Sequence, residues 1–286
     1  MSSTLPLNSA INQPLPFMQE KYTGEIKISL HKSDPARLIS AVGERISLET
    51  FTGPYSTEFR NKFSALVAKN PEIISRPEFI SLVKVFQDSV NVRRYGNGAI
   101  NTDDQIIKRI DYDSVRPLQG NVFTGLAIVD KVTGEIIGRA AIGSGSKPGE
   151  SEFGLALRRD YHGKKIGKEA ALLMSALALT YFENKFSVGN KKEKLPVTTF
   201  TATALNTNIA SRKLLSIGCK PIKSLPSNLF QRFACFIHLD KLLNWIGLPL
   251  SMRQSYAIKG SDLRSILGKQ MDINKLHISY ETHAGI

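Results

Sequence analysis

Cysteine is scarce in this chain of 286 residues, which contains only Cys219 and Cys235. Two cysteines are too few for the disulfide framework of a small secreted domain. The sequence also lacks an apolar run long enough to cross a bilayer, and its first residues do not follow the pattern of a secretory signal. These absences favour a reducing compartment, and we expect a cytoplasmic location.

Histidine is sparse as well, with five in the chain. His277 and His283, near the C-terminus, have no partner at the spacing of a metal site. The sequence therefore predicts no metal centre.

Negative charge is in deficit, since 25 Asp and Glu stand against 38 Lys and Arg, for a net charge of +13. The excess gathers in segments 158–168 and 185–223. Such a field attracts anionic partners, whether a phosphorylated cofactor or nucleic acid. A solvated basic surface has the same composition, so charge alone leaves these interpretations open.

The pattern of apolar residues divides the chain into three parts. Residues 1–24 are polar and interrupted by proline, which predicts a mobile N-terminal arm. Residues 25–225 alternate between strand and helix patterns and predict one α/β domain. Residues 226–286 form an extension that completes the sheet. Within it we expect a helical insertion and two closing strands, at 229–250, 255–258 and 278–280.

A strand, a basic turn with glycines and a long helix follow one another in the middle of the chain. The strand is expected at Glu152–Leu157 and the amphipathic helix at Lys168–Phe182. The first turn of a helix offers unpaired N–H groups and a positive dipole end, so residues 162–168, here termed the phosphate loop, are expected to bind phosphate. This loop lacks G-x-x-x-x-G-K-[ST] and G-x-G-x-x-G, which argues against a nucleoside triphosphate or dinucleotide site.

The phosphate loop resembles motif A of the GNAT superfamily of acetyl-CoA-dependent N-acetyltransferases, written Q/R-x-x-G-x-G/A. His162, Lys165 and Gly167 fall on its defined positions, and Gly163 matches a glycine common inside it. His162 replaces the usual Gln or Arg, and Lys165 replaces the central glycine.

Other segments are similar, in the same order, to the Rim-type branch of that family, which acetylates protein α-amines. The resemblance covers about residues 45–218. The segments that carry it are Val92–Tyr95, Val129–Arg139, Glu152–Leu157, Lys168–Ala170 and Asn208–Gly218.

The resemblance implies an α/β fold, with a mixed, mostly antiparallel, splayed sheet flanked by helices, and acetyl-CoA bound at the splay. It implies that backbone groups of Leu155, Ala156 and Leu157 pair with the pantetheine arm. Asn208 would bond the pantetheine, with Asn206 as an alternative. The pyrophosphate would be held by the phosphate loop, namely His162, Gly163, Lys164, Lys165, Ile166, Gly167 and Lys168.

The implied reaction is direct transfer of acetyl to a primary amine. An amine is mostly protonated at neutral pH, so a base assists, and Glu152 beside the cofactor is the candidate. Ser211 is the candidate donor to the leaving thiolate, because Leu214 and Leu215 occupy the region where many members carry a tyrosine.

The acceptor is expected to be a protein or peptide α-amine, with a small polyamine or aminoglycoside as the alternative. A second hypothesis is a CoA-binding interaction module with weak catalysis, which Lys165 and the missing tyrosine favour. Nucleic-acid binding rests on charge alone and is less favoured. Residues 229–250 are expected to cover the core or form a homodimer contact.

Overall fold

In some strands of this protein, buried residues alternate with more exposed ones. In β1, for example, Ile26, Ile28 and Leu30 are buried, while Lys27 is exposed. Because successive strand residues point to opposite faces, this pattern gives the strand one face for the core.

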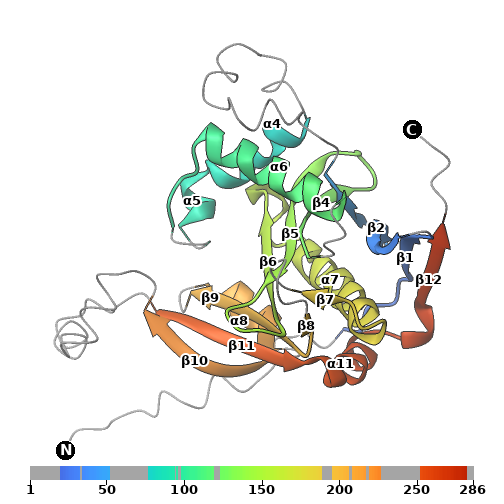
Figure 1. Cartoon of the computed structure of the whole chain (residues 1–286). Helices are drawn as coiled ribbons and strands as arrows, with labels where there is room; N and C mark the ends of the chain where they lie inside the picture. Colours follow the sequence, from blue (N-terminus) through green and yellow to red (C-terminus); the bar gives the residue numbers. More distant parts are fainter. Residues whose placement is uncertain are drawn as a thin grey trace, which may run out of the picture.

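The computed structural model describes the chain in ten segments: residues 20–32, 34–51, 77–93, 95, 98–118, 123–188, 195–205, 208–216, 219–226 and 252–281. Ten strands form one sheet with helices on its faces (Figure 1). Their order is β10-β11-β9-β6-β5-β4-β3-β2-β1-β12. Two neighbouring pairs, β6–β9 and β1–β12, are parallel and the others are antiparallel. The predicted mixed, mostly antiparallel α/β fold is confirmed.

The strands of the large sheet are β1 (Ile26–His31), β2 (Asp34–Val42), β3 (Ile46–Thr50), β4 (Gly125–Asp130), β5 (Ile136–Ser144), β6 (Glu150–Leu157), β9 (Thr199–Leu205), β10 (Lys220–Pro226), β11 (Met252–Lys259) and β12 (Leu276–Glu281). A separate short ladder pairs β7 (Ser187–Val188) with β8 (Leu195–Pro196). The helices are α4 (Pro77–Phe86), α5 (Ser89–Val92), α6 (Asp103–Leu118), α7 (Ile166–Glu183), α8 (Ile209–Ser216) and α11 (Leu263–Gln270). Short 3₁₀ turns lie at Arg159–Tyr161, Gly260–Asp262 and Ile273–Lys275.

Helices cover both faces of the sheet. Leu157 of β6 packs in a cluster with α7 and α11, whereas its neighbour Ala156 packs in a second cluster with α4 and α6. Neighbouring residues of a strand point to opposite faces, so the two helical layers lie on opposite sides of β6. The start of α6 is fixed by a capping box, in which Thr102 and Gln105 each accept a hydrogen bond from the other's backbone N–H.

The sheet splays between β6 and β9. These two strands pair in parallel from Glu150 to Phe153, but β6 continues to Leu157. Residues 154–157 therefore form an open edge on the side that faces β9, and they stay paired to β5 on the other side.

The segment 252–281 contributes two strands to the sheet, one inside the edge strand β10 and one at the opposite edge. β11 lies between β9 and β10, and β12 pairs with β1 (Figure 1). Strands therefore form where the sequence predicted 255–258 and 278–280. The expected helix at 229–250 lies outside the described residues, as do Cys235 and His283.

Tyr22 contacts the domain through its backbone and its side chain. Tyr22 donates its backbone N–H to Gln270 O at 2.7 Å and forms a parallel bridge with Met271. Its hydroxyl accepts a hydrogen bond from Glu44 N at 2.8 Å, and burial raises the pKa of Tyr22 to about 12. Residues 20–24 therefore contact the domain, and residues 1–19 of the predicted arm lie outside the described part of the chain.

The sequence did not predict β10, and its residues Pro221 and Pro226 explain part of this. Proline lacks an N–H donor and is confined to edge strands, where that donor is not needed. β10 is such an edge. In the part of the chain that the structure describes, no helix has both the length and the apolar character needed to cross a membrane.

Candidate functional site

The open edge of β6 exposes backbone groups at every second residue. Arg158 donates to Ile137 O and Gly145 donates to Glu150 O, so even-numbered residues of this strand bond to β5. In a regular antiparallel ladder the residues between them point away from that partner. The N–H and C=O of Leu155 and the N–H of Leu157 therefore face the gap between β6 and β9.

Ala156, the third residue predicted to pair with pantetheine, has the opposite backbone orientation from Leu155 and Leu157. Its backbone groups point to Arg139 of β5 and are not available to a pantetheine chain. The carbonyl of Leu157 is also engaged, because it accepts from Asn91 Nδ2 at 2.9 Å and lies 3.1 Å from His162 Nε2. The His162 ring thus contacts the end of the strand.

The phosphate loop lies at the end of this open edge, where α7 begins. Residues 163–165 are exposed, and Gly167 and Lys168 are half-buried. In this stretch, which the structure describes in full, the N–H groups of residues 163–167 donate no hydrogen bond to another described residue. The first N–H bonded within the protein is that of Lys168, to Lys165 O at 3.1 Å. The loop can therefore offer several amides to an anion.

Two residues of the loop have a positive φ, namely Gly163 at 77° and Lys165 at 62°. Lys165 is the residue before α7 and has a ψ of 3°, which is the left-handed region. A non-glycine residue in this region costs about 1–3 kcal/mol unless its surroundings hold it there. Glycine adopts this region without that cost, and in this chain lysine adopts it.

Two of the three lysines near the start of α7, Lys165 and Lys168, contact Glu20. Lys165 Nζ lies 2.6 Å from Glu20 Oε2, and Lys168 Nζ donates to Glu20 O. The hydrogen bond from Lys165 lowers the pKa of Glu20, and burial lowers the pKa of Lys168. Lys164 instead lies over the ring of Tyr161, with Nζ 5.1 Å from the centroid.

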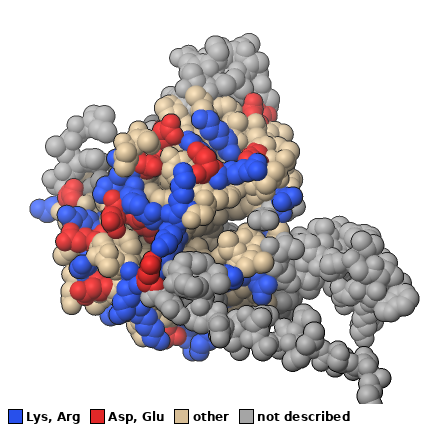
Figure 2. Space-filling model, turned by 180° about the vertical axis from the view of Figure 1, so that it is seen from behind, with Lys and Arg blue, Asp and Glu red and all other residues tan. Residues whose placement is uncertain are grey.

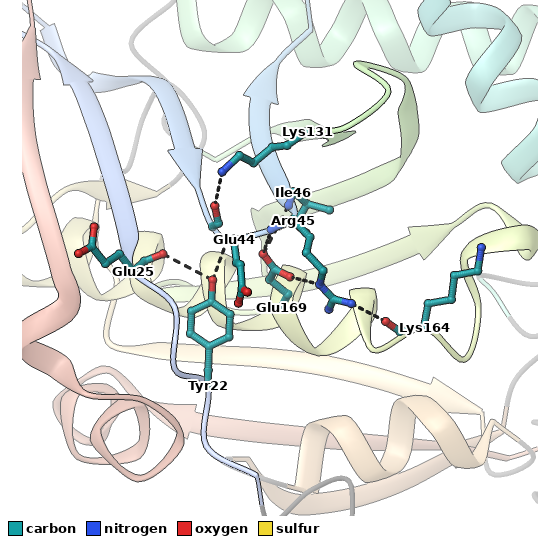
Figure 3. Close-up of polar contacts among 9 residues, drawn as sticks. Tyr22, Glu25, Glu44, Arg45, Ile46, Lys131, Lys164 and Glu169 are labelled. Atoms are coloured by element: carbon teal, nitrogen blue, oxygen red, sulfur yellow. Dashed lines mark hydrogen bonds and ion pairs between the residues drawn. The ribbon is translucent and has the colours of Figure 1, made fainter.

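Arg45 contacts the phosphate loop, and its side chain lies between Glu169 and Lys164 (Figure 3). Glu169 is 2% exposed, and its carboxylate accepts hydrogen bonds from Arg45 N at 2.8 Å and from Arg45 Nε at 2.9 Å. Arg45 Nη1 also donates to Lys164 O at 2.8 Å. One side chain thus joins the first turn of α7 to the phosphate loop.

Glu152 lies two residues before the open edge of β6, which begins at Gly154. It is paired with Thr201 of β9, its side chain is exposed, and Thr203 Oγ1 donates to its Oε1 at 3.4 Å. A Cβ at Gly154, two residues further, would lie 3.7 Å from the Tyr95 hydroxyl. Because residues two apart share a face, Glu152 points to the side of the sheet that α4 and α6 cover.

Arg253 of β11 lies beside Thr203 and Glu152. No pattern in the sequence predicted that Arg253 belongs to this site. Its Nη2 donates to Thr203 Oγ1 at 3.0 Å. Burial lowers the pKa of Arg253, and the nearby Glu152 carboxylate opposes that shift. Arg253 is distant from β6 in the sequence, and only the place of β11 next to β9 brings it here.

Ser211 and Asn208 lie at the start of α8. Asn208 Oδ1 accepts from Ser211 N at 3.2 Å, so Asn208 acts as the N-cap of this helix. That bond engages the side-chain oxygen of the residue predicted to contact pantetheine. Ser211 is half-buried, and Asn206 lies outside the described residues.

On one face of the molecule the surface charge is mixed. Figure 2 shows acidic side chains next to basic ones over the face turned away from the viewer of Figure 1.

Within the described residues, no group of His, Cys, Asp and Glu could hold a metal ion. The free Cys219 has a pKa raised by burial to about 11, so its thiol is protonated at neutral pH.

Comparison with known proteins relates the chain to one family. The family model described as "Acetyltransferase (GNAT) domain" matches residues 75–217, half of the chain. Similar solved structures include an acetyltransferase of the GNAT family from Bacillus anthracis, with 13% identity and a TM-score of 0.48 over 76% of this chain and 96% of that chain. A GCN5-related N-acetyltransferase from Brucella melitensis has 12% identity and a TM-score of 0.47 over 79% and 81% of the two chains. A search of curated protein sequences found no match.

Proposed function

Since the chain belongs to the acetyltransferase (GNAT) domain family, we propose that this acetyl-CoA-dependent acyltransferase acetylates a protein or peptide α-amine. The observation that carries the proposal is the open edge of β6, which leads directly to a loop with unbonded amides at the start of α7. An extended arm can pair with a free strand edge, and a diphosphate can bind such amides.

Acetyl-CoA fits the residues of this site. The pantetheine arm would bond to the backbone of Leu155 and Leu157, and the pyrophosphate would bind the amides of residues 163–167. Lys164, Lys165 and Lys168 would neutralise phosphate charge, and for the latter two this requires that Glu20 be displaced. The thioester supplies an activated acetyl group, so holding the amine beside it accounts for much of the rate.

Glu152 is the proposed base. As the amine nitrogen bonds to the acetyl carbon, its proton would pass to the Glu152 carboxylate, directly or through water. The carbon–sulfur bond breaks, and the thiolate would take a proton from Ser211 or from solvent. The geometry that favours Glu152 is its place next to the splay, on the face of the sheet opposite α7.

An α-amine suits this arrangement better than a lysine side chain. Its ordinary pKa is about 8 against about 10.4 for lysine, so a larger fraction is neutral near pH 7. Glu152 is exposed, which suits the end of a chain that approaches from outside the molecule. The similarity of several segments to the Rim-type branch supports the same acceptor class.

The test is calorimetry with acetyl-CoA, followed by thiol-release assays on panels of peptides, polyamines and aminoglycosides. We expect 1:1 binding of acetyl-CoA and turnover with peptides that have a free α-amine, but not with N-terminally blocked ones. Turnover with polyamines or aminoglycosides alone would reject the acceptor class. Binding without any thiol release would favour a CoA-binding module.

Substitution of Glu152 tests its role. Glu152→Gln should retain acetyl-CoA affinity and lower kcat by about 10²–10⁴-fold, the usual contribution of a general base. Glu150→Gln is the matched control, because Glu150 lies on the same face of the same strand and bonds to Ser146. Equal rates for the two variants would exclude Glu152 as the base.

A further inference from the structure

We infer that Arg45 is a positioning residue for the proposed acetyl-CoA site: it orients the amides of the phosphate loop without touching the cofactor. This inference rests on the proposed function, in which the loop binds the pyrophosphate. It adds a residue from the loop between β2 and β3, far in sequence from the loop that it would control (Figure 3).

The first step of the argument is the orientation of one peptide unit. Arg45 Nη1 donates to Lys164 O at 2.8 Å and so draws that carbonyl toward β3. The carbonyl of one residue and the N–H of the next lie on opposite sides of a planar trans peptide. Anchoring Lys164 O therefore turns the N–H of Lys165 away from Arg45, and this N–H bonds to no described residue.

The second step is the backbone of Lys165. Its left-handed conformation, with φ 62°, is unfavourable for any residue with a Cβ. Its own carbonyl is fixed by the N–H groups of Lys168 and Glu169, at 3.1 and 3.3 Å. Arg45 fixes the peptide that precedes Lys165, so both sides of this residue are held.

The third step concerns the charge of Glu169. Its carboxylate lies in the first turn of α7, close to where phosphate charge would be bound. Bonds from Arg45 N, Arg45 Nε and Ile46 N direct the carboxylate to β3. The guanidinium also compensates its negative charge, which would otherwise repel an anion at this helix end.

Arg45 can act in this way because its own loop is fixed. Lys131 Nζ donates to Gly43 O at 2.9 Å, and the Tyr22 hydroxyl accepts from Glu44 N. A Cβ at Gly43 would lie 2.6 Å from Glu169 Oε1, so glycine lets the carboxylate approach this loop without shifting. Arg45 therefore connects the phosphate loop to a fixed part of the sheet.

The experiment compares Arg45→Met with a matched control, Arg264→Met. Arg264 forms a two-bond pair with Glu183, at 2.9 and 2.8 Å, in the last turn of the same helix. We expect Arg45→Met to raise the Kd and KM for acetyl-CoA roughly tenfold. This is the size of effect expected when a strained backbone conformation is no longer held in place. The KM for the acceptor should stay unchanged, and Arg264→Met should change neither value.

A second substitution separates positioning from general stability. Glycine adopts the left-handed conformation without cost, so Lys165→Gly should reduce the loss caused by Arg45→Met. Lys165→Ala removes the same ammonium but keeps a Cβ, and it should not reduce that loss. This coupling is a readout that a merely structural role of Arg45 would not produce. Arg45→Lys, which keeps the charge with less reach, should fall between the wild type and Arg45→Met.

Three results are decisive. Wild-type acetyl-CoA affinity in Arg45→Met overturns the inference and leaves the proposed function standing. An equal loss from Arg45→Met in the wild type, in Lys165→Gly and in Lys165→Ala also overturns it. If the unsubstituted protein fails to bind acetyl-CoA, the proposed function falls and the inference with it. If Arg45→Met does not fold, the same comparisons are made with Arg45→Lys.

Discussion

At the scale of single residues, Lys165 has a backbone conformation that suits glycine, although the residue itself departs from the motif. The resembled pattern has glycine at this position, and lysine is a departure that could crowd a phosphate. In the structure Lys165 takes the left-handed turn that glycine would take, and its side chain extends to Glu20. We infer that position 165 requires a left-handed backbone conformation. A sequence motif expresses this requirement only as a preference for glycine.

Gly167 allows a test of the open edge. A Cβ added here would lie at ordinary contact distances, 3.7 and 3.8 Å, from the side chains of Leu157 and Leu155. Gly167→Ala should therefore fold and bind acetyl-CoA nearly as the wild type does. Gly167→Trp should abolish binding by filling the space between α7 and β6, with a circular dichroism spectrum that is unchanged. Calorimetry checks both variants, and tight binding by the Trp variant would contradict the proposed cofactor path.

Glu20 is expected to compete with acetyl-CoA for the phosphate loop, because it occupies Lys165 and Lys168. Glu20→Gln should lower the Kd for acetyl-CoA several-fold, since an exposed ion pair is a weak competitor. Glu25→Gln, which removes a carboxylate paired with Lys27 on the same segment, is the control and should have no effect.

The pH dependence of this contact has a defined sign. The pKa of Glu20 is lowered, so the carboxylate is charged throughout the neutral range and becomes protonated only below the ordinary carboxyl pKa. The difference between Glu20→Gln and the wild type should therefore be constant from about pH 6 to pH 8. A difference that varies with pH in this interval would show that another group controls the contact.

Contacts between side chains distant in sequence were beyond prediction. The pattern of residues 162–168 indicated an anion site, and the amides of residues 163–167 are unbonded within the described structure. Nothing in the sequence paired Arg45 with Glu169 or Arg253 with Thr203, since these pairs form only after β3, α7, β9 and β11 are in place. The roles assigned to Glu152, Ser211 and Asn208 stay predictions.

At the scale of elements, a buried ion pair fastens α6 to the sheet. Asp113 is fully buried and forms two bonds with Arg139 of β5, at 2.6 and 2.8 Å, and it also accepts from Gly125 N. Removal of one partner leaves a buried charge unpaired, which costs far more than the intact pair contributes. The helix that covers one side of the proposed acceptor face is thus held by a specific contact.

Asp113→Asn should lower the free energy of unfolding by about 3–5 kcal/mol, the usual cost of breaking a buried pair. Arg264→Met removes an exposed pair and should cost about 0–1 kcal/mol. Urea denaturation measures both. A loss below about 1 kcal/mol in Asp113→Asn would mean that the pair is dispensable for the attachment of α6.

Elements with a clear period were predicted well, and those without one were missed. The segments expected at 152–157 and 168–182 correspond to β6 and α7, with boundaries that differ by two residues or fewer. β10 was missed because its two prolines argue against a strand unless the strand is known to be an edge. The splay came from the family resemblance, because one strand's pattern does not reveal where its partner stops pairing.

At the scale of the whole molecule, the net charge of +13 should act mainly through the cofactor site. Acetyl-CoA binding should weaken roughly five- to tenfold between low salt and about 0.5 M NaCl, as exposed lysines are screened. Equimolar duplex DNA should leave the affinity unchanged, because acidic side chains lie among the basic ones on the face seen in Figure 2. Displacement of acetyl-CoA by DNA would restore the nucleic-acid hypothesis.

The position of β11 has a consequence for synthesis on the ribosome. β9 and β10 are translated first, but neither can complete its ladder until residues 252–259 emerge and enter between them. Until then β9, which borders the splay, has a bare edge that another nascent chain could capture. A chain that ends before Met252 would therefore lack the strand that pairs with β9 beside the proposed acetyl-CoA site.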